Sequence, residues 1–179
     1  HFASKGGMDI DGLGEAVVDQ LVTRGLVKTI ADIYRLRTEQ LLELDKFAEK
    51  SAQNLIAAIA ASRARELWRL IHGLGIPGVG AAAAKDLATH FRSMSALASA
   101  SEEALMAIPG IGEKTAIAIR AFFNEPANHI LIDQLRDLGI DPAPPQSTSP
   151  NGDALIGKTF VLTGTLTTMT REAATEKIE

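Results

Sequence analysis

Cysteine is absent from this chain of 179 residues, and aromatic residues make up only 4% of it. Without cysteine the chain can form neither a disulfide framework nor a thiolate metal site. With so few aromatic side chains, the core must consist of alanine, leucine, isoleucine and valine, which favours closely packed helices over a β-sandwich. The sequence shows no signal peptide and no apolar run long enough to cross a bilayer. We therefore expect a reducing, intracellular setting and no membrane partner.

The excess of positive charge that is typical of nucleic-acid-binding proteins is also missing, because the net charge is −4. The charges are unevenly distributed, however. Residues 46–92 contain seven basic and three acidic side chains, a net charge of +4, whereas the rest of the chain contains eleven and nineteen, a net charge of −8. The middle of the chain could therefore present a basic face. A solvated helical surface explains the same charges equally well.

Candidate catalytic and metal-binding residues are scarce. The four histidines are scattered, without a carboxylate or a second histidine at ligand spacing, and no nucleophile lies beside a base. Residues 73–78 match the GxGxxG pattern of dinucleotide sites, but a predicted helix precedes them where such a site needs a strand. We predict no catalytic residue and no metal site in this chain.

Four short segments share a pattern that begins with an apolar residue and ends in Gly-apolar-Gly. The clearest is residues 108–112; residues 10–14 and 76–80 repeat it, and residues 44–48 are a degenerate copy without either glycine. We call these segments turns 1 to 4 in chain order. The first glycine position is 12, 46, 78 and 110, so the spacing is 34, 32 and 32 residues. Two glycines around one apolar residue make a tight turn whose backbone can come close to another molecule.

Further columns repeat with the turns. An apolar residue lies two positions before the first glycine position, a small residue six positions after it, and a larger apolar residue three positions further on. The last two columns contain Val18, Ala52, Ala84 and Ala116, and Leu21, Leu55, Leu87 and Ile119. The small residue lets two helices approach each other, and the larger one sets their angle. The pattern predicts four tandem helix–hairpin–helix motifs. A period near 33 also occurs in helical solenoids, but their signature residues are absent.

The remaining local signals predict the domain organisation. Capping residues and apolar periodicity predict helices at 15–24, 30–35, 49–63, 66–73, 81–91, 93–97, 101–105, 113–123 and 127–138. A further helix is predicted to begin at residue 38. Residues 1–8 are predicted to be the end of a helix. Residues 1–140 are therefore expected to be all-α. Residues 141–153 contain four of the seven prolines and read as a linker. Residues 154–179 read as a strand followed by a helix, the start of a truncated α/β unit.

The turns have a chemistry that suits nucleic acid. The first amides of a helix have no partner within it and lie at the positive end of its dipole, so they bind anions such as phosphate. Lys50 and Lys114 occupy one column after turns 2 and 4 and could add a charge-assisted contact, although solvated lysines are an alternative interpretation. Ala16 and Ala82 fill this column after turns 1 and 3. The predicted DNA-binding residues are Gly12, Leu13, Gly14, Lys46, Phe47, Ala48, Lys50, Gly78, Val79, Gly80, Gly110, Ile111, Gly112 and Lys114.

Several runs resemble bacterial NAD-dependent DNA ligases. The run HFASKGGMDIDGLG (residues 1–14) is similar to the segment that follows the zinc finger of that family, and EKSAQNL (49–55) and LGIPGVG (74–80) resemble the segments after it. The run GKTFVLTGTL (157–166), with REA at 171–173, looks like the opening of the family's BRCT domain. The resemblance covers essentially the whole chain, in the expected order.

The resemblance implies a parent enzyme that adenylates itself from NAD, transfers the AMP to a 5′-phosphate and seals nicks in DNA replication and repair. In the family the adenylation domain, the oligonucleotide-binding barrel and the zinc finger precede this segment, so NAD, Mg and Zn are expected in the parent and not on this chain. His1 in place of methionine fits a piece of a longer protein. The piece itself is expected to clamp nicked duplex DNA and to be inactive alone. The parent is expected to be a monomer in the bacterial cytoplasm, at the nucleoid.

Two features depart from the family pattern. Residues 81–84, after turn 3, are all alanine where the family usually has a glutamate, and turn 2 lacks both glycines. Two other functions stay open. Tandem hairpins also serve repair nucleases and resolvase subunits, although the BRCT-like residues 154–179 argue against that origin. Hairpin pairs can also act as protein-interaction modules.

Overall fold

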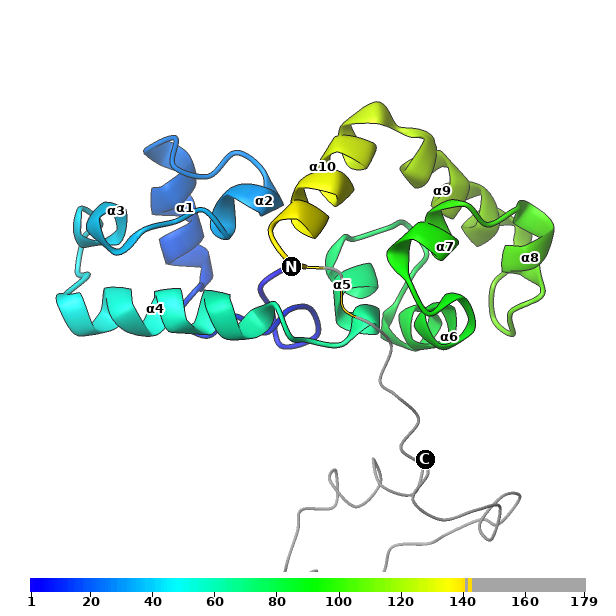
Figure 1. Cartoon of the computed structure of the whole chain (residues 1–179), viewed down its shortest axis with the longest axis horizontal. Helices are drawn as coiled ribbons and strands as arrows, with labels where there is room; N and C mark the ends of the chain where they lie inside the picture. Colours follow the sequence, from blue (N-terminus) through cyan, green and yellow to red (C-terminus); the bar gives the residue numbers. More distant parts are fainter. Residues whose placement is uncertain (141, 143–179) are drawn as a thin grey trace, which may run out of the picture. The chain divides into compact units, whose positions relative to one another are not determined.

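Ten helices joined by short turns and loops form the part of the chain that the computed structural model describes, residues 1–140 and 142 (Figure 1). They are α1 (Glu15–Thr23), α2 (Ile30–Ile33), α3 (Thr38–Leu42), α4 (Glu49–Ser62), α5 (Leu67–Gly73), α6 (Ala81–Phe91), α7 (Met94–Ala98), α8 (Glu102–Met106), α9 (Glu113–Asn124) and α10 (Pro126–Asp137). No strand occurs within the described residues, so the all-α prediction is confirmed for them. Apart from Pro142, the predicted linker and the predicted α/β unit at 154–179 lie outside the described residues.

The short helices begin at the capping residues that the sequence places before them. The hydroxyl of Ser93 accepts a hydrogen bond from the amide of Ala96 at the start of α7, and Ser101 accepts one from Ala104 at the start of α8. Such caps satisfy amides that have no partner inside the helix and typically contribute about 1 kcal/mol. These connectors therefore form at the predicted places because the local sequence determines their ends.

The helices enclose one continuous apolar core built from the repeating columns. Three of the four small residues, Ala52, Ala84 and Ala116, have no exposed surface. The larger apolar column is equally inaccessible, with Leu21, Leu55, Leu87 and Ile119 at 0–1% exposure. Burying a side chain of this size contributes roughly 1.5–3 kcal/mol. The columns that identify the repeat in the sequence are therefore the residues that hold the helices together.

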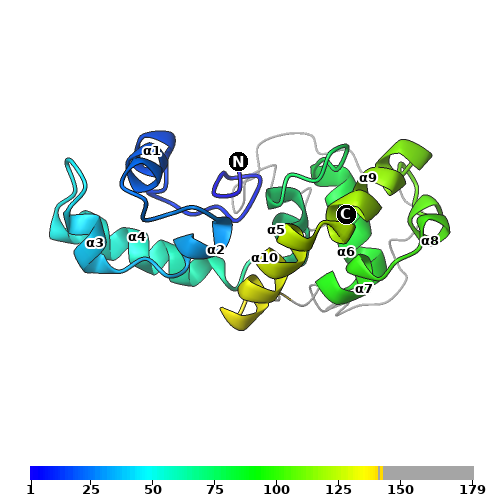
Figure 2. The same ribbon diagram turned by 90° about the horizontal axis from the view of Figure 1, so that it is seen from above.

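The helices fall into two groups. Figures 1 and 2 show α1–α4 gathered on one side and α5–α10 on the other, with the start of the chain between them. We call these groups the first half and the second half. Among the described helices, the substantial helix–helix contact between the halves is that of α2 with α10. The remaining substantial helix contacts lie within one half, so each half packs largely around its own pair of turns.

The prediction of a helix end at residues 1–8 is wrong. These residues form successive turns, in which the amide of Met8 donates to the carbonyl of Phe2 at 2.8 Å and that of Ile10 to Ala3 at 3.0 Å. Gly7 explains part of this conformation, because a Cβ there would lie 2.4 Å from the carbonyl oxygen of Phe2. The close return of the chain on itself replaces the helical hydrogen bonds with these turn bonds.

Tyr34, the single tyrosine of the chain, is buried at the end of α2. Its hydroxyl lies 3.1 Å from that of Ser62, which is only 1% exposed and also donates to the carbonyl of Ile59. Burial raises the pKa of Tyr34 above its ordinary value of 10.0, and the hydrogen bond with Ser62 and the charge of Arg63 only partly oppose this rise. The fold therefore stabilises the neutral phenol.

The raised pKa of Tyr34 predicts a loss of stability in alkali. Below about pH 10 the phenol is neutral in both states and has no pH-dependent effect; above it, the unfolded chain releases the proton first, so the free energy of unfolding falls. We expect wild-type stability to decline more steeply than that of Tyr34→Phe between about pH 9 and pH 11. Urea unfolding across this range measures the difference. Parallel curves for the two proteins would contradict the prediction.

Candidate nucleic-acid interface

The four turns have the same backbone geometry. The residue at the first glycine position has a left-handed conformation in each, with φ of +81° at Gly12, +64° at Lys46, +79° at Gly78 and +82° at Gly110. In each turn the next residue donates its amide to the carbonyl three residues earlier, over 3.0–3.2 Å. Lys46 adopts a conformation that an L side chain disfavours, and it is exposed. The degenerate copy therefore folds like the turns that have glycine.

The tips of the turns are held by the core. Leu13, Val79 and Ile111 are only 5–6% exposed, and Phe47 is half-buried. Their amides are the donors of the turn hydrogen bonds. These four residues, which the sequence predicts as DNA-binding, therefore have their side chains packed inward and their amides already used. In the structure these residues shape the turn.

The amides that remain available follow the tip. The second glycine position is the N-cap of the next helix in every turn, occupied by Gly14, Ala48, Gly80 and Gly112. All four residues are exposed. In the described part of the chain, their amides and those of the next two residues have no hydrogen-bond acceptor. Each turn thus presents three outward amides at the positive end of a helix dipole, which is an arrangement suited to a phosphate.

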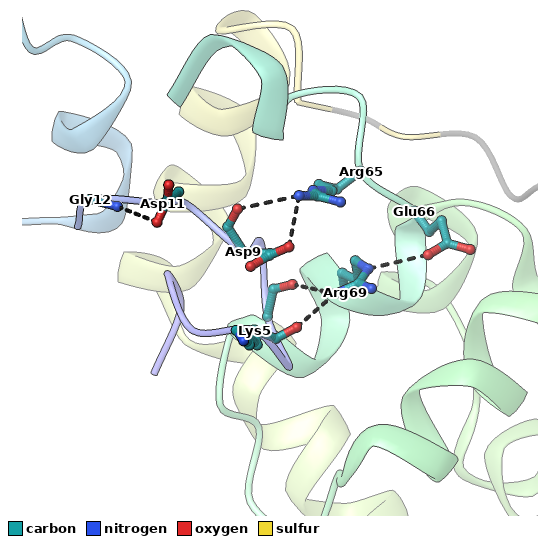
Figure 3. Close-up of polar contacts among 8 residues, drawn as sticks. Lys5, Asp9, Asp11, Gly12, Arg65, Glu66 and Arg69 are labelled. Atoms are coloured by element: carbon teal, nitrogen blue, oxygen red, sulfur yellow. Dashed lines mark hydrogen bonds and ion pairs between the residues drawn. The ribbon is translucent and has the colours of Figure 1, made fainter. Parts of the chain in front are cut away.

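Side-chain charge distinguishes the turns from one another. Lys50 and Lys114 are exposed and make no ion pair among the described residues, so their charges are available beside turns 2 and 4. Turn 1 has Ala16 in place of this lysine, and the carboxylate of Asp11 within the turn accepts the amide of Gly12 at 3.0 Å (Figure 3). Turn 2 also contains an aspartate, and a glutamate begins the helix after each of turns 1, 2 and 4, so it is the lysines that distinguish turns 2 and 4. Turns 2 and 4 are therefore better suited to an anion than turn 1.

The basic face predicted from residues 46–92 is smaller than the charge count indicates. Arg63, Arg65 and Arg69 are all occupied by acceptors within the fold. The exposed cations that remain in this stretch are Lys46, Lys50, Lys85 and Arg92, and Lys85 lies 5.2 Å from the ring centroid of Trp68. The sequence does not predict these internal roles, because the acceptors are far away along the chain. Leu138 is 75 residues from Arg63, Asp9 is 56 residues from Arg65, and Lys5 is 64 residues from Arg69.

Other classes of site find no support in this part of the chain. No group of three or more histidine, cysteine, aspartate or glutamate side chains within residues 1–140 and 142 is placed to hold a metal ion. None of the helices described is both long and apolar enough to span a bilayer. The repeated geometry of the four turns makes their sets of outward amides the candidate functional surface.

Comparisons with known proteins agree with this geometry. Residues 8–61 match the family described as a SAM-like helix-hairpin-helix tandem, and residues 69–132 match the helix-hairpin-helix motif family. The first range contains turns 1 and 2, and the second contains turns 3 and 4.

Two curated relatives are similar over the whole chain. "DNA ligase 1" of Opitutus terrae is 54% identical over 184 residues, covering 100% of this chain and 27% of the relative. "DNA ligase" of Marinobacter nauticus is 45% identical over 179 residues, covering 100% of this chain and 26% of the relative. The chain thus spans about a quarter of the length of these relatives.

Proposed function

We propose that this chain is the helix–hairpin–helix region of a DNA ligase and that it clamps duplex DNA for a parent enzyme that seals nicks. In this proposal all four turns act as hairpins that contact the phosphate backbone in the minor groove on either side of the nick. The parent acts in replication and repair as a monomer in the bacterial cytoplasm, at the nucleoid. Residues 154–179 begin its BRCT domain.

The observation that carries the proposal is the set of outward amides at the second glycine position of each turn. Amide donors at a helix N-terminus bind a phosphate without contacting a base. Phosphate contacts fix the position of a protein on the duplex and contain no sequence information. The interaction is therefore independent of base sequence, which suits an enzyme that must act at a nick anywhere in the genome.

The catalytic chemistry belongs to other parts of the parent in this proposal. We propose NAD as the adenylate donor, with Mg and Zn also in the parent. Among the described residues, no group of three or more histidine, cysteine, aspartate or glutamate side chains is placed to hold a metal ion. We therefore assign to this region only the binding and positioning of DNA, and no step of the sealing reaction.

Salt dependence tests the proposal. We expect the affinity for a duplex of any sequence to fall steeply with salt, with a log–log slope of about −0.9 per phosphate neutralised. Fluorescence anisotropy with intact and nicked duplexes over a range of salt concentrations measures the slope. A salt-independent Kd, or strong preference for one base sequence, would show that the region does not bind as proposed.

The lysines beside turns 2 and 4 provide a second test. Replacing both lysines, with Lys50→Ala and Lys114→Ala in one chain, should make the log–log slope of affinity against salt concentration shallower by about 1 for each lysine. Each change should weaken binding by about fivefold or less at moderate salt, because the side chains are exposed. Lys28→Ala is the matched control, since Lys28 is also exposed but lies outside the four turns. If the control changes the slope as much as the pair does, the charge acts non-specifically.

A further inference from the structure

The segment between the two family-matched ranges contains a cluster of internal arginine contacts. Helix α4 ends at Ser62 and α5 begins at Leu67, and we call residues 63–66 the junction. Arg63 and Arg65 lie in the junction, and Arg69 lies in the first turn of α5. All three donate to groups distant in the sequence, although they sit where the chain passes from the first half to the second.

Arg63 contacts both halves at once. One terminal nitrogen donates to the carbonyl of Leu138, at the end of α10, over 2.9 Å, and the other approaches the carbonyl of Tyr34, at the end of α2, at 3.3 Å. The guanidinium carbon lies 5.7 Å from the centroid of the Tyr34 ring. The planar fork of arginine suits two separate acceptors, whereas a lysine ammonium is a single point charge. Arg63 thus ties the ends of α2 and α10, the helices through which the halves meet.

Arg65 and Arg69 fasten the start of the chain to the same place (Figure 3). Arg65 pairs with the carboxylate of Asp9 at 2.8 Å, and Asp9 directly precedes turn 1. Arg69 donates to the carbonyl of Lys5 at 2.8 Å and pairs with Glu66 at 3.2 Å. The start of the chain lies between the halves and leads into turn 1, so the contacts with Asp9 and Lys5 hold the segment before the first half against the junction and α5.

We propose that Arg63, Arg65 and Arg69 form a coupling that holds the two halves in one orientation, so that both bind the same duplex together. The inference rests on the proposed function and adds a positioning role for these arginines. Two linked binding surfaces can exceed the affinity of either by about 10²–10⁴ when their geometry allows simultaneous contact. A fixed orientation spares the cost of ordering the halves on binding.

The coupling makes the arginines important for DNA that reaches both halves. We compare a duplex of about 30 base pairs, roughly 100 Å long, which we expect to contact both halves, with one of about 10 base pairs, which we expect to engage fewer turns. In the whole chain we replace all three arginines by lysine, which keeps the charge and removes the fork. Arg35→Lys with Arg136→Lys is the matched control, because within residues 1–140 each of these arginines forms an ion pair with a nearby aspartate three residues earlier and with no other carboxylate.

We expect the triple variant to bind the long duplex about tenfold more weakly than wild type, and the short one within about twofold. The control should bind both like wild type. The Asp9→Asn variant separates the effect of the coupling from that of net charge. The substitution makes the chain more positive, so net charge alone predicts tighter binding of DNA. Loss of the ion pair with Arg65 instead predicts weaker binding of the long duplex. This single change also tests the coupling if the triple variant fails to fold.

Each outcome of the anisotropy titrations decides the matter. Selective weakening on the long duplex, in the triple variant or in folded Asp9→Asn, supports the coupling. Equal weakening on both duplexes, or unchanged binding in these variants, overturns the coupling and leaves the proposed function standing. Failure of the wild-type chain to bind either duplex overturns the proposed function and the coupling with it.

Discussion

Gly112→Val is expected to weaken binding to duplex DNA by about 10- to 100-fold while the chain stays folded. Gly112 is the N-cap of α9, with φ −87° and ψ 171°, a conformation open to any residue, and a Cβ there would have no neighbour within 4 Å. The fold therefore does not require glycine at this position. A valine side chain would instead occupy the space through which a phosphate reaches the amides of residues 112–114. Losing charge-assisted hydrogen bonds of about 1.5–3 kcal/mol accounts for the expected effect.

Three comparisons isolate this effect. Lys114→Ala should weaken binding less, by about fivefold or less, because it removes one solvated charge and leaves the amides open. Gly112→Ser keeps a good helix cap and adds a small side chain, so we expect intermediate binding without loss of stability. Ala48→Ser adds a hydroxyl at the corresponding position of turn 2, which already has a Cβ, and should change the affinity for DNA little. If Lys114→Ala loses more affinity than Gly112→Val, with both variants folded, the amides are not the main contact.

The helices of the described region are predicted well from the sequence because local signals coincide with packing. The predicted helix at 81–91 is α6 (Ala81–Phe91), and the one at 113–123 is α9 (Glu113–Asn124). In both, a turn with a left-handed residue determines where the helix begins, and the repeated column of small and larger apolar residues determines its buried face. Local turn chemistry and tertiary burial therefore favour the same boundaries.

Contacts between distant residues explain what the sequence does not predict. Nothing near Arg65 indicates that its partner is Asp9, 56 residues earlier, so the sequence does not distinguish this arginine from a free surface cation. The turn tips show the same limit at the candidate site. The pattern identifies the four turns but does not tell which amides close the turn and which remain free. That distinction follows from the hydrogen bonds of residues such as Ile111, whose amide donates to Ile108.

The largest expected change in stability comes from Ile119→Ala. Ile119 belongs to the larger apolar column, has no exposed surface, and is followed one turn later by Phe123, which is 1% exposed. Truncating such a residue removes apolar burial and leaves a cavity, which costs about 2–5 kcal/mol. Small domains have a total stability of about 5–15 kcal/mol, so this single change should remove a large fraction of the free energy of unfolding.

Ile117→Ala is the matched control for Ile119→Ala. Ile117 lies on the same helix two residues earlier, and its side chain is 48% exposed. Both variants replace isoleucine by alanine within α9, so both gain the same helix propensity, and the difference between them reports burial. We expect Ile117→Ala to stay within about 0.5 kcal/mol of wild type in urea unfolding. Similar losses in the two variants would mean that α9 does not bury the predicted face. A large loss in Ile119→Ala alone would show that the repeated column supports turn 4, because this residue holds α9, the helix capped by Gly112, in place.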